Sequence, residues 1–145
     1  MISNTYANKI LNVACGVSGS VSLPEYLYLG LCSAEPNTSS GVITGEPTAA
    51  PSYARVPVGG SKHSIKYFGS ASGGKISNST EIHFKTAQED WGTMKYFFLS
   101  ESTTGVAILW GKINGDNGVE IKVTNGEVVP VFYVGDLKAS IDVEI

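Results

Sequence analysis

Two histidines, many serines and a few acids are the side chains of this sequence that could perform catalysis or bind a metal. His63 and His83 lie on different predicted strands, and neither has Cys, Asp or Glu neighbours at the spacing of a metal site. No serine lies in the Gly-x-Ser-x-Gly turn that presents a nucleophile in hydrolases. Glu89 and Asp90 are adjacent, so in a strand they would face opposite sides and could not act together on a glycosidic bond. The sequence therefore predicts no catalytic residues, no metal site, no cofactor and no enzyme.

Two further segments resemble ligand-binding loops only in composition. Residues 114–118, Asn-Gly-Asp-Asn-Gly, are rich in oxygen ligands but lack the spacing and the closing Glu of a calcium loop. A plain turn is the favoured interpretation. The Gly-rich residues 69–74 are not followed by the Gly-Lys-Ser/Thr that would bind phosphates at the start of a helix. Nucleotide binding is not predicted.

Four large side chains remain as candidates for an interface or a binding surface: Tyr53, Arg55, Trp91 and Trp110. Arg55 is the single arginine, and its guanidinium could bind a carboxylate through two parallel hydrogen bonds, within a subunit or between subunits. Trp110 alternates in phase with Ile108, which favours packing in the core or at a subunit interface. Trp91 lies at a turn, where its indole could cap the end of the fold or bind a sugar ring from an exposed position.

Short antiparallel strands are the elements predicted to position these candidates. Leu27, Leu29 and Leu31 alternate with Tyr28 and Gly30, the period-two pattern of a core strand that starts near residue 25. Further strands are predicted at residues 53–58, 61–67, 82–84, 93–99, 106–112, 119–123, 127–134 and 137–145, with Gly, Asn or Asp turns between them. About eight to nine such strands predict an all-β fold, an antiparallel, jelly-roll-like β-sandwich or a distorted barrel.

One short helix is predicted before the first strand, at residues 3–15. Ser3 or Asn4 can cap its start, and Gly16 is placed to end it in the left-handed conformation. Apolar residues recur at helical spacing at Tyr6, Ile10, Val13 and Ala14. Such a stripe usually packs on a sheet, but at a chain terminus it could dock on a neighbouring subunit.

A long Pro- and Ser-rich loop is predicted at residues 33–52, after the first strand. A connection of about 20 residues without regular structure is uncommon in a compact domain and is usually functional or mobile. In a binding module it would be a contact arm, and the alternative is a loop that lies along its own domain. Length alone does not separate these two interpretations.

Composition limits the class of protein. The chain has 145 residues, which fits a single domain spanning residues 1–145. The net charge is −3 with 10 basic residues, so nucleic acid is not an expected partner. Cys15 and Cys32 are too few for a disulfide framework, and we expect both to be reduced. No apolar run is long enough for membrane insertion, and no signal peptide is evident, so we expect assembly in a cytoplasm.

Landmarks along nearly the whole chain resemble a family of small tail-fibre-like virion proteins of tailed bacteriophages. The features that carry the resemblance are Asn8-Lys9-Ile10-Leu11, Leu27-Tyr28-Leu29-Gly30-Leu31, Pro36-Asn37, Tyr53-Ala54-Arg55-Val56, Asn78 with Ile82-His83-Phe84, Ala87 with Trp91-Gly92-Thr93, the hairpin of residues 105–111, and Gly135-Asp136-Leu137. No single motif is diagnostic, and their order carries the resemblance. Ser100-Glu101-Ser102, in place of the family's Asp-Ala turn, and Pro57 depart from its pattern in loops or edges.

The resemblance implies a non-enzymatic structural protein of the virion, assembled in the cytoplasm of the bacterial host. It would be a tail fibre, collar or baseplate appendage or a capsid decoration protein, and its partners would be other virion proteins. Physical reasoning adds a homo-oligomer, a trimer or a ring, because copies of the chain can cover each other's strand edges and apolar rims. The alternative is an adhesion module that binds host-surface glycan through Trp91 and loop tyrosines.

Overall fold

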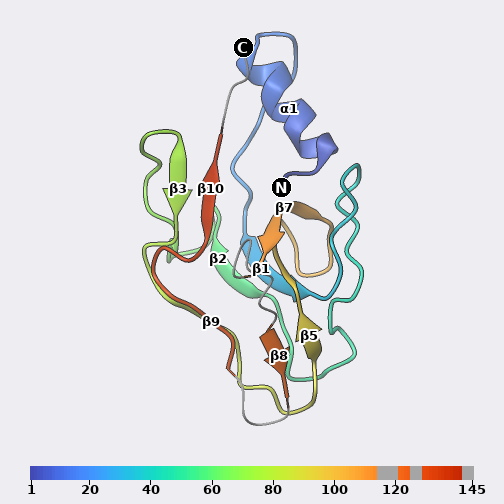
Figure 1. Ribbon diagram of the computed structural model, residues 1–145. Coiled ribbons are helices and arrows are strands. Elements are labelled where there is room, and N and C mark those ends of the chain that lie inside the picture. Colours follow the sequence, from blue (N-terminus) through green and yellow to red (C-terminus); the bar gives the residue numbers. More distant parts are fainter. Residues whose placement is uncertain (114–120, 125–128, 142–145) are drawn as a thin grey trace.

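The computed structural model describes residues 1–113, 121–124 and 129–141, and these residues form an all-β fold with one short N-terminal helix (Figure 1). The elements in chain order are α1 (Asn4–Ala14), β1 (Leu27–Cys32), β2 (Val56–Gly59), β3 (Lys75–Ser77), β4 (Ile82–His83), β5 (Gly92–Met94), β6 (Tyr96–Ser100), β7 (Ala107–Lys112), β8 (Ile121–Val123), β9 (Val131–Phe132) and β10 (Lys138–Ser140). Every strand pair is antiparallel. The predicted all-β class and the short N-terminal helix are confirmed, whereas the predicted turns at residues 114–118 and 125–126 lie outside the described residues.

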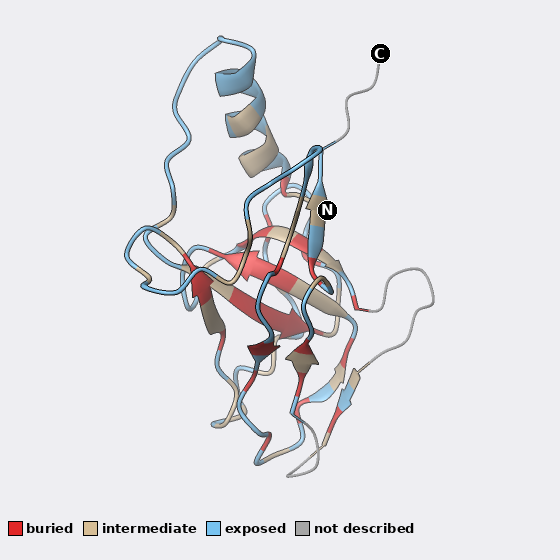
Figure 2. Ribbon diagram, turned by 90° about the vertical axis from the view of Figure 1, so that its left-hand side faces the viewer, coloured by how far each residue is buried: buried red, intermediate tan, exposed pale blue. Residues whose placement is uncertain are grey.

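A four-stranded sheet in the order β2-β1-β6-β7 is the centre of the fold, and Figure 2 shows that most of its residues are buried. The predicted alternation in β1 is confirmed, because Leu29 and Leu31 face one core and Cys32 faces another. Three two-stranded pairs, β3–β10, β4–β9 and β5–β8, accompany the sheet, and the first core lies between the sheet and the last two pairs. These pairs contribute buried side chains such as Ile82, Met94 and Val123. The second layer is therefore assembled from short ribbons.

The other face of the sheet is covered by the loop of residues 33–52. Here Phe98 and Trp110 are buried, and Ile43 of the loop packs against them. The main-chain N–H of Ala107 donates to the carbonyl of Gly41 (2.8 Å), so the loop also pairs with β7. The backbone of Gly41 has a positive φ of 76°, and a Cβ there would lie 2.0 Å from the Ala107 carbonyl oxygen. The loop lies along its own domain, as one of the two interpretations expected.

A β-bulge changes which residues of β7 share a face. Leu99 pairs with Leu109 and Ser100 pairs with Ala107, which leaves Ile108 as the extra residue. The bulge reverses the alternation, so Ala107 and Trp110 share one face while Ile108 belongs to the other core. The predicted common phase of Trp110 and Ile108 is therefore wrong, although Trp110 is buried as expected.

The helix α1 starts and ends where the sequence predicts. The Ser3 hydroxyl accepts a hydrogen bond from the Tyr6 N–H (3.3 Å), and Gly16 follows the helix with a φ of 70°. Before the helix, Ile2 forms a bridge with Leu109, and the Ser3 N–H donates to the Ile108 carbonyl (3.1 Å). These contacts attach the base of α1 to the edge of β7 and direct the helix away from the sheet (Figure 2).

Three sequence predictions need correction. Residues 61–67 are not a strand, because the N–H groups of Ser61 and Lys62 bind the carbonyls of Pro24 and Glu25 in place of a ladder partner. The strand predicted at residues 53–58 is displaced to β2, so that Tyr53 and Arg55 precede it. Finally, β3 is a strand that the sequence did not predict, between the Gly-rich residues 69–74 and the strand predicted at residues 82–84.

Candidate functional site

Arg55 forms a buried ion pair with Glu46, a residue of the loop 33–52. Arg55 Nε lies 2.8 Å from Glu46 Oε1, and Nη2 lies 2.8 Å from Oε2, so the carboxylate is bound through two parallel hydrogen bonds. The two side chains are only 4% and 9% exposed. The carboxylate clamp expected of Arg55 therefore forms within the chain, and it joins the loop to the segment that leads into β2.

The remaining donors of Arg55 reach a second part of the chain. Its Nη1 donates to the carbonyls of Ser102 (2.8 Å) and Gly105 (2.9 Å), both in the turn between β6 and β7. The guanidinium carbon lies 4.8 Å from the centre of the Phe98 ring, a cation–π contact inside the fold. One guanidinium thus connects the loop, β6 and the β6–β7 turn, and its polar atoms are occupied by this chain's own residues.

Tyr53 completes this cluster. Its hydroxyl donates to Glu46 Oε1 (2.8 Å) and accepts a hydrogen bond from the Leu31 N–H (3.1 Å). The pairing of β1 with β2 covers only residues 27–29, so the tyrosine serves as the partner that the β1 backbone lacks beyond that point. Burial, together with the neighbouring Glu46 carboxylate, raises the pKa of Tyr53 far above its ordinary value. The hydroxyl stays protonated and acts as a structural hydrogen-bond donor.

Trp91 lies at the end of the same cluster and is 5% exposed. Its ring meets the ring of Tyr53 edge-on at 5.3 Å, and its indole Nε1 donates to the Ser52 hydroxyl (3.1 Å). Ser52 in turn donates from its hydroxyl to Glu89 and accepts from the Gln88 N–H (3.0 Å). Trp91 caps the end of the core, which is one of the two positions that the sequence left open, and offers no exposed ring to a sugar.

Trp110 lies on the opposite face of the sheet and is 2% exposed. Its indole Nε1 donates to Glu35 Oε1 of the loop 33–52 (3.3 Å). The structure therefore brings together Tyr53, Arg55 and Trp91 but places Trp110 elsewhere. All four residues hold the loop 33–52 or its flanks against the sheet.

Glu46 and Ser52 of these networks were not singled out from the sequence, and Asn78, which forms a separate network, was named there only as a landmark of the family resemblance. Glu46 is one of only two acids in the loop 33–52. An acidic residue that is rare in its polar segment is the signal that could have identified a partner for Arg55. Asn78 is 1% exposed, and its amide donates to the carbonyls of Thr80 and Tyr133 and accepts from the Leu137 N–H. Nothing in the local sequence of Asn78 indicated this role.

The residues considered for metal binding and catalysis are dispersed. His83 lies 3.0 Å from Glu81 on the surface, and His63 contacts the carbonyl of Ile65. Within residues 1–113, 121–124 and 129–141, no group of three or more His, Cys, Asp or Glu side chains could hold a metal ion. In the same part of the chain, no helix combines the length and the apolar character that crossing a bilayer would require. Cys15 and Cys32 are both free thiols.

An exposed segment that we call the N-terminal arm, residues 4–23, is the other distinctive feature. Its helix α1 has no buried residue, and Tyr6 is the part of α1 that packs, partly buried, against the core. Every residue from 11 to 23 is exposed. The predicted packing of the helix on a sheet is therefore wrong. Leu11, Val17 and Leu23 are exposed to 58%, 71% and 79%.

Comparison with known proteins gives one result that covers almost the whole chain. The family model described as podophage GP4 fiber I protein gp80 matches residues 1–140. No curated protein matches the chain. The matched range includes the N-terminal arm, the central sheet and the Arg55 cluster. The chain therefore belongs to the podophage GP4 fiber I protein family and is a structural protein of the phage virion.

Proposed function

We propose that the protein acts as a homo-oligomeric subunit of a virion appendage, in which the N-terminal arm of each copy docks on a neighbouring copy. The observation that carries this proposal is the absence of any buried residue in α1. An isolated helix of 11 residues is marginally stable in water, because helices this short depend on tertiary packing. A docking surface on a second copy would supply that packing.

The composition of the N-terminal arm suits burial between subunits. Lys9 is its one charged side chain, so docking would remove little charge from water. The exposed apolar side chains of the arm are Leu11, Val13, Val17, Val21 and Leu23. Several large apolar side chains exposed along one short segment commonly mark a site of protein–protein contact.

The base of the arm supports a defined geometry of assembly. The N–H groups of Asn4 and Thr5 donate to the carbonyls of Thr38 and Ser39, in addition to the contacts that Ile2 and Ser3 make with β7. The helix thus leaves the body from two fixed anchor points. Arms held in one direction favour a closed arrangement such as a trimer or a ring, because each copy presents the same arm and the same docking surface.

A second copy of the chain is the occupant that we propose for the arm. Another virion protein is the alternative outcome of the test below. Glycan adhesion through Trp91 is not part of the proposal, because that indole is buried and hydrogen-bonded to Ser52.

Sedimentation velocity of the purified chain tests this proposal. The wild type should sediment as an oligomer of defined size, and Leu11→Asp with Val17→Asp should sediment as a monomer whose near-UV circular dichroism is unchanged. Val42→Asp with Ile65→Asp is the matched control, because these two exposed apolar residues lie outside the arm. A monomeric wild type, or an oligomer that survives the arm substitutions, would overturn the proposal and leave another virion protein as the arm's partner.

A further inference from the structure

The ribbon formed by β3 and β10 carries a separate polar surface. Residues 68–78 form a hairpin through Gly73 and Gly74, whose φ angles of 59° and 73° suit a two-residue turn. Ser72 forms a bridge with Lys75, and Lys75 also pairs with Ser140. Residues directly opposite each other in a ladder point to the same face. Ser72, Lys75 and Ser140 therefore form one row across the ribbon.

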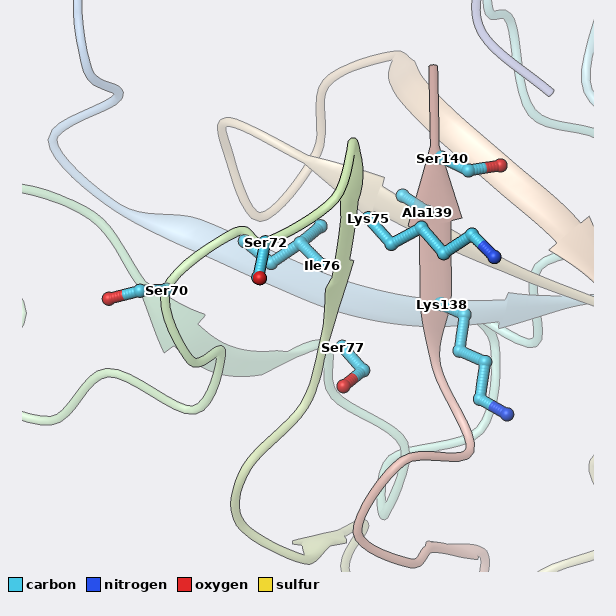
Figure 3. Close-up of a pocket in the computed structure, with 8 residues that line it drawn as sticks. All are labelled: Ser70, Ser72, Lys75, Ile76, Ser77, Lys138, Ala139 and Ser140. Atoms are coloured by element: carbon cyan, nitrogen blue, oxygen red, sulfur yellow. The ribbon is translucent and has the colours of Figure 1, made fainter. Parts of the chain in front are cut away.

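A second row follows two residues further along β3. Lys138 pairs with Ser77, and residues two apart in a strand share a face, so this row lies beside the first. Lys75 and Lys138 are diagonal neighbours, a relationship that places such side chains about 7–8 Å apart at their bases. Figure 3 shows both lysines extending to the same side of the ribbon. The two ammonium groups thus share one face of the ribbon with the hydroxyls of the two serines that pair with these lysines.

An open hollow lies on this surface, with a volume of about 570 Å³. Its lining residues are Ser70, Ser72, Lys75, Ile76, Ser77, Lys138, Ala139 and Ser140. The ammonium groups of Lys75 and Lys138 make no ion pair or hydrogen bond with any residue that the structure describes, although both backbones are paired within the ribbon. Lys62, by contrast, pairs with Glu25 at 2.9 Å, and Lys66 donates to the carbonyls of Gly60 and His63. The two ribbon lysines are therefore free to bind an anion.

We propose that this hollow binds a saccharide that carries carboxylate or phosphate groups. The two ammonium groups would bind the anionic groups through charge-assisted hydrogen bonds. The serine hydroxyls both donate and accept, which matches the hydroxyl groups of a sugar ring, whereas a bare anion needs donors alone. The chain as a whole is acidic, with a net charge of −3, so attraction of an anion requires local positive charge, which the two lysines supply on this surface.

The chemistry of the hollow also sets the strength of binding. Its eight lining residues include no aromatic ring, so a sugar would bind there without stacking. A single copy should therefore bind weakly, and several copies on one particle would gain avidity on a repeating polymer. The proposal does not depend on assembly through the N-terminal arm, because each copy holds its own ribbon.

Nuclear magnetic resonance titration of the ¹⁵N-labelled full chain tests the proposal. The probes are oligogalacturonate for carboxylate, phosphorylated maltodextrin for phosphate, and unmodified maltodextrin as the neutral saccharide. We expect chemical-shift changes at residues 70–77 and 138–140 with one or both anionic saccharides. The saccharide that causes them identifies the anionic group that the hollow binds. Lys75→Gln with Lys138→Gln should weaken binding by about tenfold for each ammonium group removed.

The control for this experiment is Lys85→Gln with Lys122→Gln, which changes the net charge equally at exposed positions outside the ribbon. This control variant should bind like the wild type. Wild-type dispersion of amide resonances in the spectra of both variants would show that each is folded. Equal losses in both variants would overturn the proposal, as would the absence of shifts with both anionic saccharides. Equal binding of unmodified maltodextrin, or of a short oligodeoxynucleotide, would also overturn it.

Discussion

Gly30 of β1 lies directly beneath the ring of Phe98 on β6, and the ring occupies the space that a side chain at position 30 would need. The two residues are register partners, and a Cβ on Gly30 would lie 2.2 Å from Phe98 Cζ. The same relationship recurs between Gly111 and Phe97, where a Cβ would lie 2.8 Å from the ring. Aromatic rings of β6 thus cover a glycine on each neighbouring strand, which explains two glycines inside a sheet.

Gly30→Ala should lower the free energy of unfolding by about 1–3 kcal/mol, because the fully buried Phe98 ring has no free space into which to move. Urea denaturation of the pure protein measures this change. Gly59→Ala is the matched control: Gly59 is also a strand glycine, but a Cβ there meets nothing within 4 Å. Its effect should stay within about 0.5 kcal/mol. Equal losses in the two variants would show that ring contact is not the cause.

Arg55→Ala should cost about 3–5 kcal/mol of stability, because it leaves the Glu46 carboxylate buried without its partner. The measurement is again urea denaturation, with Lys85→Ala as a control at an exposed cation. Glu46→Leu added to Arg55→Met should recover part of the loss, since an apolar pair leaves no buried charge. If the double variant instead loses as much stability as the two single variants together, Arg55 and Glu46 do not act as a coupled pair.

Cys15 should react with iodoacetamide much faster than Cys32. Burial, reinforced by the nearby Glu46 carboxylate, raises the pKa of the Cys32 thiol to about 12, so almost no thiolate is present near neutral pH. Cys15, in contrast, lies exposed after α1. Mass spectrometry of the native protein should find one modified cysteine, and Cys15→Ser should remove that signal. Rapid modification of Cys32 in the folded Cys15→Ser variant would contradict the buried position.

The environment of Trp91 should change at low pH, because protonation of Glu89 alters its hydrogen bond with Ser52, which in turn binds the Trp91 indole. The hydrogen bond from the Ser52 hydroxyl is the main cause that holds the pKa of the Glu89 carboxyl below its ordinary value of 4.5. A depressed folded pKa means that this contact stabilises the fold above the unfolded pKa and is lost as the pH falls through the folded pKa. The Trp91 indole N–H resonance should therefore titrate below pH 4.5. Glu89→Gln should abolish that titration, and a wild-type resonance that stays constant would contradict it.

Sequence reasoning succeeded where the controlling contacts are local. The alternation of Leu29 and Leu31, the cap at Ser3 and the stop at Gly16 each depend on neighbours a few residues away, and the structure confirms all three. The strand β3 was missed because it has three residues with one apolar side chain, and its identity as a strand comes from pairing with the distant β10.

The candidate residues were found more reliably than their partners. Arg55 and Trp91 stood out by type, but Glu46 and Ser52 became visible only when the loop 33–52 folded back on the sheet. The face of Trp110 could not be predicted either, because one extra residue at Ile108 reverses the alternation, and no local residue pattern marks a bulge there. Long-range pairing therefore accounts for most of what the sequence did not predict.

The attachment of Ile2 and Ser3 to β7 has a consequence for how copies of the chain can associate. With those residues in place, the outer backbone of β7 is already paired, together with the contribution of Gly41. A strand from another molecule cannot add at this edge, so contacts that another copy makes with β7 must use side chains. Proteolytic removal of the first three residues would bare that ladder and convert an ordered component into a template for fibrillar aggregation.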